Sequence, residues 1–237
     1  MRNFLYILLF VICSRHAFSA CVIGDALWQA KQYTKAISTY EQCAYDKNDA
    51  VAQYRLAMLY LNGNDNVKQD IKQALFFFRL ASENGYAPAQ RELAKLLDTL
   101  ENLGDVGKQG IIAWKNLMEP MGFNCNIPAF SWALLAAEKQ ENKWFYPTEQ
   151  RFDEQAAQLV DAWTKQKGQD QKRQAAEKAI EWKQIRLLKS AKTLLSDTEY
   201  KDFLKVLTST EKGQAARSRK QHATEKLKQI WKAKKGQ

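Results

Sequence analysis

The residue types that carry out acid-base and nucleophilic catalysis are sparse in this chain of 237 residues. It contains two histidines, His16 and His222. A Ser-His-Asp or Cys-His site needs a histidine base beside its nucleophile, and no motif ties a serine or cysteine to His222. The adjacent carboxylates of Asp153 and Glu154 would point to different sides of a helix rather than toward each other. The sequence therefore predicts a protein that is not an enzyme and has no catalytic residues.

Metal and phosphate sites are not indicated either. Cys43 and Cys125 lack the close cysteine or histidine that a zinc ligand pair requires. Gly104, Gly107 and Gly110 have neither a preceding strand nor a following Lys-Ser/Thr, so they do not form a phosphate-binding loop. We interpret these glycines as a degenerate turn and expect no metal and no cofactor.

Residues 1–19 have the order of an export signal. Arg2 gives a basic start, residues 4–13 form an apolar run, and Ala17 and Ser19 supply the small residues for cleavage after Ser19. The alternative, a buried first helix, fits this order less well. No later apolar run is long enough to span a bilayer. We therefore expect a periplasmic or secreted protein of a bacterium, without a transmembrane segment once the signal is removed.

Three cysteines remain after removal of the signal with Cys13: Cys21, Cys43 and Cys125. Cys21 and Cys43 should lie side by side at two ends of an antiparallel helical hairpin, so we predict a disulfide between them. Its loop of about 20 residues would contribute on the order of 3 kcal/mol. The stretch before Cys21 also resembles the bacterial lipoprotein box, a less favoured alternative in which Cys21 is lipidated and Cys43 and Cys125 form the pair. In a third alternative all three stay reduced.

A phrase recurs at a spacing of 37 residues. Ala52-Gln53-x-x-Leu56-Ala57 returns as Ala89-Gln90-x-x-Leu93-Ala94. Self-similarity at this period is typical of a solenoid, in which helical hairpins bury their apolar sides by stacking. The apolar spacing in residues 25–45 predicts a further hairpin ahead of this phrase.

One repeat resembles the Sel1-like repeat family, a relative of the tetratricopeptide repeats. The residues in the family's order are Ala52-Gln53, Leu56, Tyr60, Gly63, Val67, Asp70, Ala74, Phe77-Phe78, Ala81 and Gly85. The resemblance implies helix-turn-helix units and adaptor, assembly or host-interaction roles. Some family members are periplasmic immunity proteins that block a secreted lipase or other toxin.

The predicted architecture is all-α. A short Sel1-like solenoid of helical hairpins covers residues 20–166, and a basic helical extension covers residues 167–237. Within the solenoid we expect a glycine-interrupted stretch and a short helix over 113–118. We also expect a helix over 129–137 that corresponds to the second helix of a repeat, and a closing helix that contains Trp163.

The extension carries most of the positive charge. It has 19 lysines and arginines against 8 acidic residues, whereas the whole chain has a net charge of +10. Its spacing predicts three amphipathic helices, two of which begin at Ser196-x-x-Glu199 and Thr208-x-x-Glu211. The basic surface is predicted at Lys183, Arg186, Lys189, Arg217, Arg219, Lys228 and Lys232. Three interpretations of this basic surface stay open: solvated helices without a partner, an anchor to an anionic envelope surface, and a site for an acidic protein. Because the chain is expected to be exported, we predict no nucleic acid as a partner.

Protein binding is the function that this organisation favours. The first helices of successive repeats form a concave face that grips peptides or folded proteins. In the second unit, Gln53, Tyr54, Met58 and Leu61 alternate with core positions and are predicted to contact the partner. We therefore expect a non-enzymatic scaffold or adaptor of the cell envelope. A periplasmic immunity protein and a binder of cell wall or lipopolysaccharide are the alternatives.

Overall fold

The computed structural model describes residues 20–64, 66–138, 152–208, 222–227, 229–230 and 233, with side chains from Ile23 onward. The predicted signal, residues 1–19, lies outside this part of the chain. The described elements are helices, in agreement with the predicted all-α class. They are α2 (Ala20–Gln29), α3 (Tyr33–Asp46), α4 (Ala50–Asn62), α5 (Ile71–Glu83), α6 (Ala87–Asn102), α7 (Gly104–Met118), the short 3-10 helix η1 (Glu119–Met121), α8 (Ala129–Ala136), α9 (Glu154–Gln166), α10 (Gln169–Leu194) and α11 (Asp197–Thr208).

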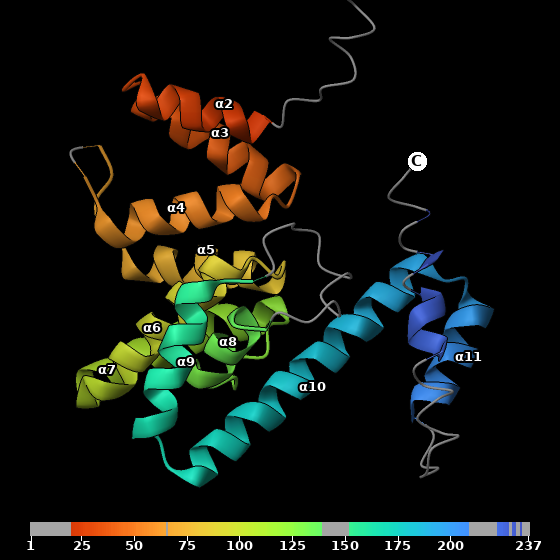
Figure 1. Cartoon of the computed structure of the whole chain (residues 1–237). Helices are drawn as coiled ribbons and strands as arrows, with labels where there is room; N and C mark the ends of the chain where they lie inside the picture. The colour runs from red at the N-terminus through yellow and green to blue at the C-terminus, as the bar shows by residue number, and fades with distance from the viewer. Residues whose placement is uncertain are drawn as a thin grey trace, which may run out of the picture.

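Sequential hairpins stack along the first half of the molecule. Helix α2 packs on α3 and α4 packs on α5, while α3 and α5 also pack on the first helix of the next unit. Figure 1 shows these helices following one another down the molecule. In the third unit α8 packs extensively on α6, so that α8 takes the second-helix position and α7 is inserted between them in the sequence. The helical-hairpin solenoid is thus confirmed.

Side-chain caps and glycines set the limits of the repeat helices. The carboxylate of Asp49 accepts from the amide of Ala52 at 2.8 Å at the start of α4. Asp153 caps α9 in the same way, accepting from Ala156 at 2.8 Å. Gly85 follows α5 with φ of +76°, the left-handed conformation that ends helices. The local sequence therefore sets where these helices begin and end.

The third unit differs from the prediction. The expected short helix over 113–118 begins much earlier, at Gly104, and the glycines lie inside α7 rather than in a degenerate turn. A Cβ atom on Gly107 would lie 1.7 Å from the carbonyl oxygen of Leu100 in α6. Gly107 is therefore required for the close approach of α7 to α6, and this contact between two helices outweighs the poor helix propensity of glycine.

The basic extension begins with α10, whose first half packs on the solenoid. The hydroxyl of Ser131 in α8 donates to the carbonyl of Ala175 at 2.9 Å, and the ring centroids of Trp132 and Trp182 are 5.4 Å apart. Beyond this contact α10 runs away from the repeat helices toward α11 (Figure 1). Within the described residues, no helix has the length and apolar character needed to cross a membrane.

The two predicted helix starts in the extension have different outcomes. Ser196 and Glu199 form the predicted capping box: the Ser196 amide and hydroxyl donate to the Glu199 carboxylate at 3.0 and 2.7 Å, and α11 starts there. Thr208 is instead the last residue of α11, and its hydroxyl donates back to the carbonyl of Leu204 at 2.8 Å. Glu211, its expected partner, lies outside the described residues.

Candidate partner-binding face

Gln53 lies in the interior, which corrects its prediction as a contact residue. Its side chain is fully buried. The amide nitrogen donates to the carbonyl of Ala44 at 3.1 Å and to Asn48 Oδ1 at 2.8 Å, and its oxygen accepts from Asn84 Nδ2 at 2.9 Å. A buried amide whose hydrogen bonds are satisfied by its own chain has no group left for a partner. Gln53 holds three consecutive helix ends together instead.

The same contact recurs one unit later and explains the repeated Ala-Gln phrase. Gln90 Nε2 donates to the carbonyl of Ser82 at 3.1 Å, so each glutamine binds a carbonyl near the end of the preceding second helix. The terminal carbonyls of a helix have no partner within that helix. The glutamine therefore connects consecutive repeats, and it does so from the same position in each repeat.

Tyr54, Met58 and Leu61 lie on the outer side of α4, each half-buried. The Tyr54 ring contacts Tyr86 edge-on at 5.2 Å between centroids, which connects α4 to the start of α6. All three side chains pack partly against the core. They retain exposed surface that a partner can reach, and their role in binding stays a prediction.

Ion pairs join the first helices of neighbouring units. Arg55 of α4 binds Asp25 of α2 through Nε at 3.1 Å and through Nη2 at 3.2 Å. Arg91 of α6 binds Asp153 at the start of α9 at 2.6 Å. We define the first-helix face as the outer side of these helices, which carries Asp25, Tyr54, Arg55, Met58, Leu61, Tyr86, Arg91, Glu92, Lys95 and Asp153. Its charges largely compensate one another.

The first-helix face is hollowed on both sides of α4. One hollow of about 500 Å³ is lined by residues that include Asp25, Trp28 and Met58. The other, of about 450 Å³, includes Tyr54, Tyr86 and the Arg91–Asp153 pair. Both combine aromatic or thioether surface with a salt bridge, a mixture that suits a protein surface better than a small reactive molecule.

Burial raises the pKa of two tyrosines on this face. Desolvation raises the pKa of Tyr54 above its usual value of 10.0, and the nearby carboxylate of Glu92 adds to the effect. Burial likewise raises the pKa of Tyr86. Both tyrosines therefore keep their protons to a higher pH than a solvent-exposed tyrosine does.

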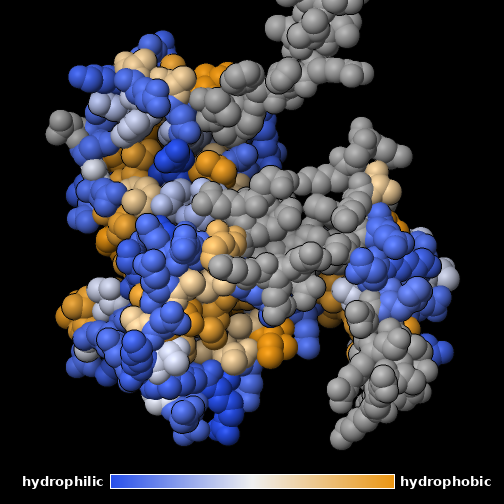
Figure 2. Space-filling view, in the orientation of Figure 1, coloured by the Kyte–Doolittle hydropathy of each residue, from blue (hydrophilic) through white to orange (hydrophobic). Residues whose placement is uncertain are grey.

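The described part of the predicted basic surface is partly neutralised. Lys183 binds Glu138 of the segment after α8 at 3.0 Å, while Lys189 is exposed and Arg186 is half-buried on α10. The other predicted positions, Arg217, Arg219, Lys228 and Lys232, lie outside the described residues. Figure 2 shows hydrophilic residues over much of the visible side of α11.

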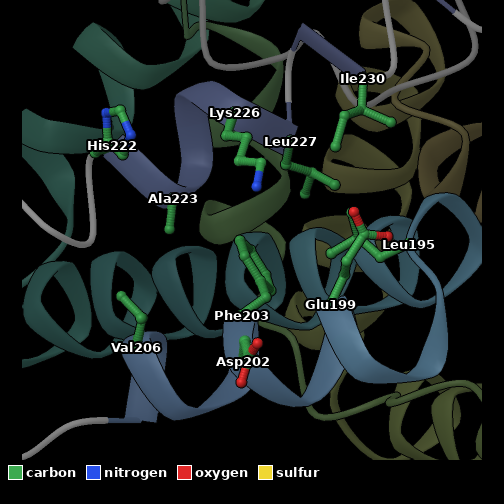
Figure 3. Close-up of a pocket in the computed structure, with 10 residues that line it drawn as sticks. All are labelled: Leu195, Glu199, Asp202, Phe203, Val206, His222, Ala223, Lys226, Leu227 and Ile230. Atoms are coloured by element: carbon green, nitrogen blue, oxygen red, sulfur yellow. The ribbon is translucent and has the colours of Figure 1, made fainter.

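A further hollow of about 540 Å³ lies in the extension, between α11 and residues 222–230. Figure 3 shows that the side chains around it come from both helices, with Phe203, Val206 and Leu227 among the apolar ones and the Lys226 chain directed into the gap. Glu199, Asp202 and His222 also border this hollow. Residues on both helical segments thus contribute to one apolar cluster, which includes Phe203 and Leu227.

The described cysteines, Cys43 and Cys125, both have buried side chains. Cys125 is a free cysteine, and burial raises the pKa of its thiol, which disfavours the reactive thiolate. Cys43 is completely buried in α3, but the side chain of Cys21 lies outside the described part of the chain, so the pairing of these two stays a prediction. Across the residues that the structure describes, no group of three His, Cys, Asp or Glu side chains is placed to hold a metal ion.

A buried charged cluster escaped the sequence-based prediction. Arg79 in α5 is fully buried and binds Glu83 at 2.6 Å and the carbonyl of Asn124 at 2.8 Å. Its guanidinium lies over the rings of Trp132 at 4.8 Å and Phe123 at 5.6 Å. The only sequence signal was the Arg79–Glu83 spacing of four, which surface ion pairs on helices share. The cluster stabilises the fold rather than forming an accessible site.

Sequence comparison agrees with the arrangement of α4 and α5. Residues 50–86 match the Sel1 repeat model, and these residues comprise α4, its turn, α5 and the glycine that follows. Comparisons with curated proteins and with solved structures gave no match. The matched residues, the stacked hairpins and the repeated glutamine contact together show that this chain is a helical protein containing a Sel1 repeat at residues 50–86.

Proposed function

We propose that this chain is an exported, non-enzymatic protein-binding scaffold of the bacterial cell envelope, and that the first-helix face holds its partner. The observation that carries the proposal is the pair of hollows flanking α4, where exposed parts of Tyr54 and Met58 stand beside internally paired charges. Sel1 repeats support protein binding as the general activity. Export rests on the order of residues 1–19.

The physical basis of binding is shape and apolar contact rather than net charge. The Asp25–Arg55 and Arg91–Asp153 pairs hold neighbouring first helices in place before a partner arrives. A preformed surface loses less conformational entropy on binding than a flexible one. Aromatic and methionine side chains are enriched at protein interfaces, which favours Tyr54 and Met58 as contacts.

The test is crosslinking in intact cells followed by mass spectrometry. Met58→Lys and Lys95→Glu should lower recovery of the crosslinked partner at least ten-fold, because both change the first-helix face. Tyr45→Lys is the matched control, since Tyr45 is 59% exposed on α3, a second helix. Equal recovery with all three variants would exclude the face. Detection of a mature chain that begins at Ala20 in the periplasmic fraction tests export separately.

The immunity role is a specialised form of the same activity. It predicts that deletion of this gene is lethal only when a neighbouring toxin gene is intact, and that Met58→Lys reproduces the effect. The anionic-surface role makes a different prediction. Reversal of the basic positions Lys189, Arg217, Arg219 and Lys228 to glutamate would abolish sedimentation with anionic vesicles, whereas Met58→Lys would leave it unchanged.

A further inference from the structure

Helix α10 is buried at two separate places along its length. In its first half, Ala175, Ala179 and Trp182 are buried where the helix packs on α8 of the solenoid. Near its end, where α11 packs on it, Ala191 is also fully buried. The helix therefore takes part in two different packing contacts.

The two buried stretches lie on opposite sides of α10. Each residue of an α-helix advances about 100° around the axis, so Ala175, Ala179 and Trp182 fall within about 60° of one another. Ala191 follows Trp182 by nine positions, which corresponds to a rotation of about 180°. Leu188, which packs against the core, lies within about 60° of Ala191. One side of α10 thus faces the solenoid, and the other side faces the end of the chain.

The end of α10 is packed in a small unit, which we call the C-terminal module: α11 and the described residues between 222 and 230. Leu195, directly after α10, lines the same hollow as Phe203 of α11 and Leu227. Among the described helices, α11 packs chiefly on α10. Figure 1 shows α11 beside the end of α10, on the side turned away from the repeat helices.

The start of α10 is held to the solenoid by polar contacts as well as by packing. Its Ala175 carbonyl accepts from the hydroxyl of Ser131 at 2.9 Å. Two turns later, Lys183 binds Glu138 at 3.0 Å. These contacts at two points along the helix fix the direction in which the rest of α10 leaves the solenoid.

Nothing in the sequence of α10 favours a break between its two contacts. Residues 169–194 contain neither glycine nor proline, the residues at which helices most often kink. The pair of Lys178 and Glu181 at 2.7 Å links adjacent turns, and Lys192 places a positive charge in the last turn, where the helix dipole favours it. A helix of 26 residues spans about 39 Å.

We infer that α10 is a rigid spacer that holds the C-terminal module at a fixed distance from the solenoid, on the side opposite to the solenoid contact. No described residue of the module lines either hollow of the first-helix face. A partner on that face is therefore held at a set distance from the basic end of the chain. A stiff spacer admits a second contact only where its span matches, because linker length and stiffness set the effective concentration of the second site. The use of the first-helix face rests on the proposed function, whereas the spacer does not.

Distance measurements between paired spin labels by electron paramagnetic resonance test the spacer in the purified chain, expressed from its complete sequence. Labels on genetically encoded keto amino acids at the exposed positions Lys95 of α6 and Lys205 of α11 leave the natural cysteines in place. A second pair, at Lys35 of α3 and Lys95, lies within the solenoid and gives the width for one packed unit. The distance distribution of the first pair should be as narrow as that of the second.

Two insertions of equal length after Gln184, an exposed residue between the two contacts, provide the matched comparison. A helical insert, Ala-Glu-Ala-Ala-Ala-Lys-Ala, adds up to about 10 Å and nearly two full turns to α10. It should shift the distance between positions 95 and 205 and keep the distribution narrow. A glycine-serine insert of the same length has a root-mean-square span of about 15 Å and should broaden the distribution by a similar amount.

A wild-type distribution as broad as that of the glycine-serine variant overturns the inference. A glycine-serine variant that keeps the narrow distribution also overturns it, because contacts other than α10 would then fix the module. Neither measurement depends on recovery of a crosslinked partner, so the spacer and the proposed function can fail separately.

Discussion

The indole nitrogen of Trp182 lies 3.2 Å from each carboxylate oxygen of Glu83, although 99 residues separate the two in the chain. Glu83 also binds the buried guanidinium of Arg79 at the end of α5. Through this carboxylate, α10 of the basic extension is attached to the matched repeat. The first half of α10 is consequently part of the packed core, in which Trp182 is 3% exposed.

Loss of this carboxylate should be among the most destabilising substitutions in the chain. Glu83→Ala leaves Arg79 buried without its counter-charge, and removal of one member of a buried ion pair costs about 3–5 kcal/mol. Trp182→Phe removes one hydrogen bond to a charged group and should cost about 2 kcal/mol. Urea denaturation measures both. Glu177→Gln on the exposed side of α10 is the control and should change stability by less than about 0.5 kcal/mol.

Substitution of the buried glutamine should separate structure from binding. Gln53→Ala removes the side-chain donor to the Ala44 carbonyl and one of the acceptors of Asn84 Nδ2, which keeps its bonds to Asn48, at a cost of about 1–3 kcal/mol. The variant that remains folded should bind its partner as tightly as wild type, because Gln53 is not on the surface. Circular dichroism shows whether the variant is folded, and titration with the partner measures its affinity. Weaker binding by a fully folded variant would contradict a purely structural role for Gln53.

Two glycines of α7 should respond in opposite directions to alanine. Gly107→Ala would place a Cβ atom 1.7 Å from the Leu100 carbonyl oxygen, so α7 must separate from α6. Gly110→Ala meets only the tip of Leu100 at 3.5 Å, an ordinary contact. It should stabilise the helix by about 0.5–1 kcal/mol, because alanine loses less conformational entropy there. Thermal unfolding of the two variants makes the comparison, and similar melting temperatures would refute the close approach.

Stability should fall above about pH 10, the usual pKa of tyrosine. Burial raises the pKa of Tyr54, Tyr60 and Tyr86 in the folded chain. A group with a raised folded-state pKa contributes stability that is complete below its unfolded pKa and is lost as the pH rises toward its folded value. Each such group can remove at most about 1.4 kcal/mol per pH unit in that range. Denaturation curves from pH 8 to 11 should show the loss, and Tyr54→Phe should reduce its slope.

Thiol labelling tests the cysteines. In the native chain Cys125 should react at least ten-fold more slowly than after denaturation, because it is buried and burial raises its thiol pKa. In the denatured chain starting at Ala20, without reductant, the predicted Cys21–Cys43 disulfide leaves Cys125 as the one reactive thiol. Modification of Cys43 under these conditions would contradict the pairing.

The sequence by itself determined the local features of the repeat. Asp49 before α4, Gly85 after α5 and the Ser196–Glu199 box act on backbone groups within a few residues, so their spacing specifies a helix end wherever the chain folds. The recurring alanine and leucine positions likewise fixed which side of α4 and α6 is buried. These interactions are short-range, and a linear pattern contains them in full.

Only the tertiary structure decided the features that depend on residues far apart in the chain. Gly107 is helical because α6 lies against it, Gln53 is buried because three helix ends converge on its amide, and Arg79 is interior because Trp132 and Trp182 close over its pair with Glu83. From its residue type and its neighbours in the sequence alone, each of these three residues would be expected in a turn or at the surface. The free energy of packing distant helices together overrides those local preferences, and no spacing in the sequence encodes which distant surfaces meet.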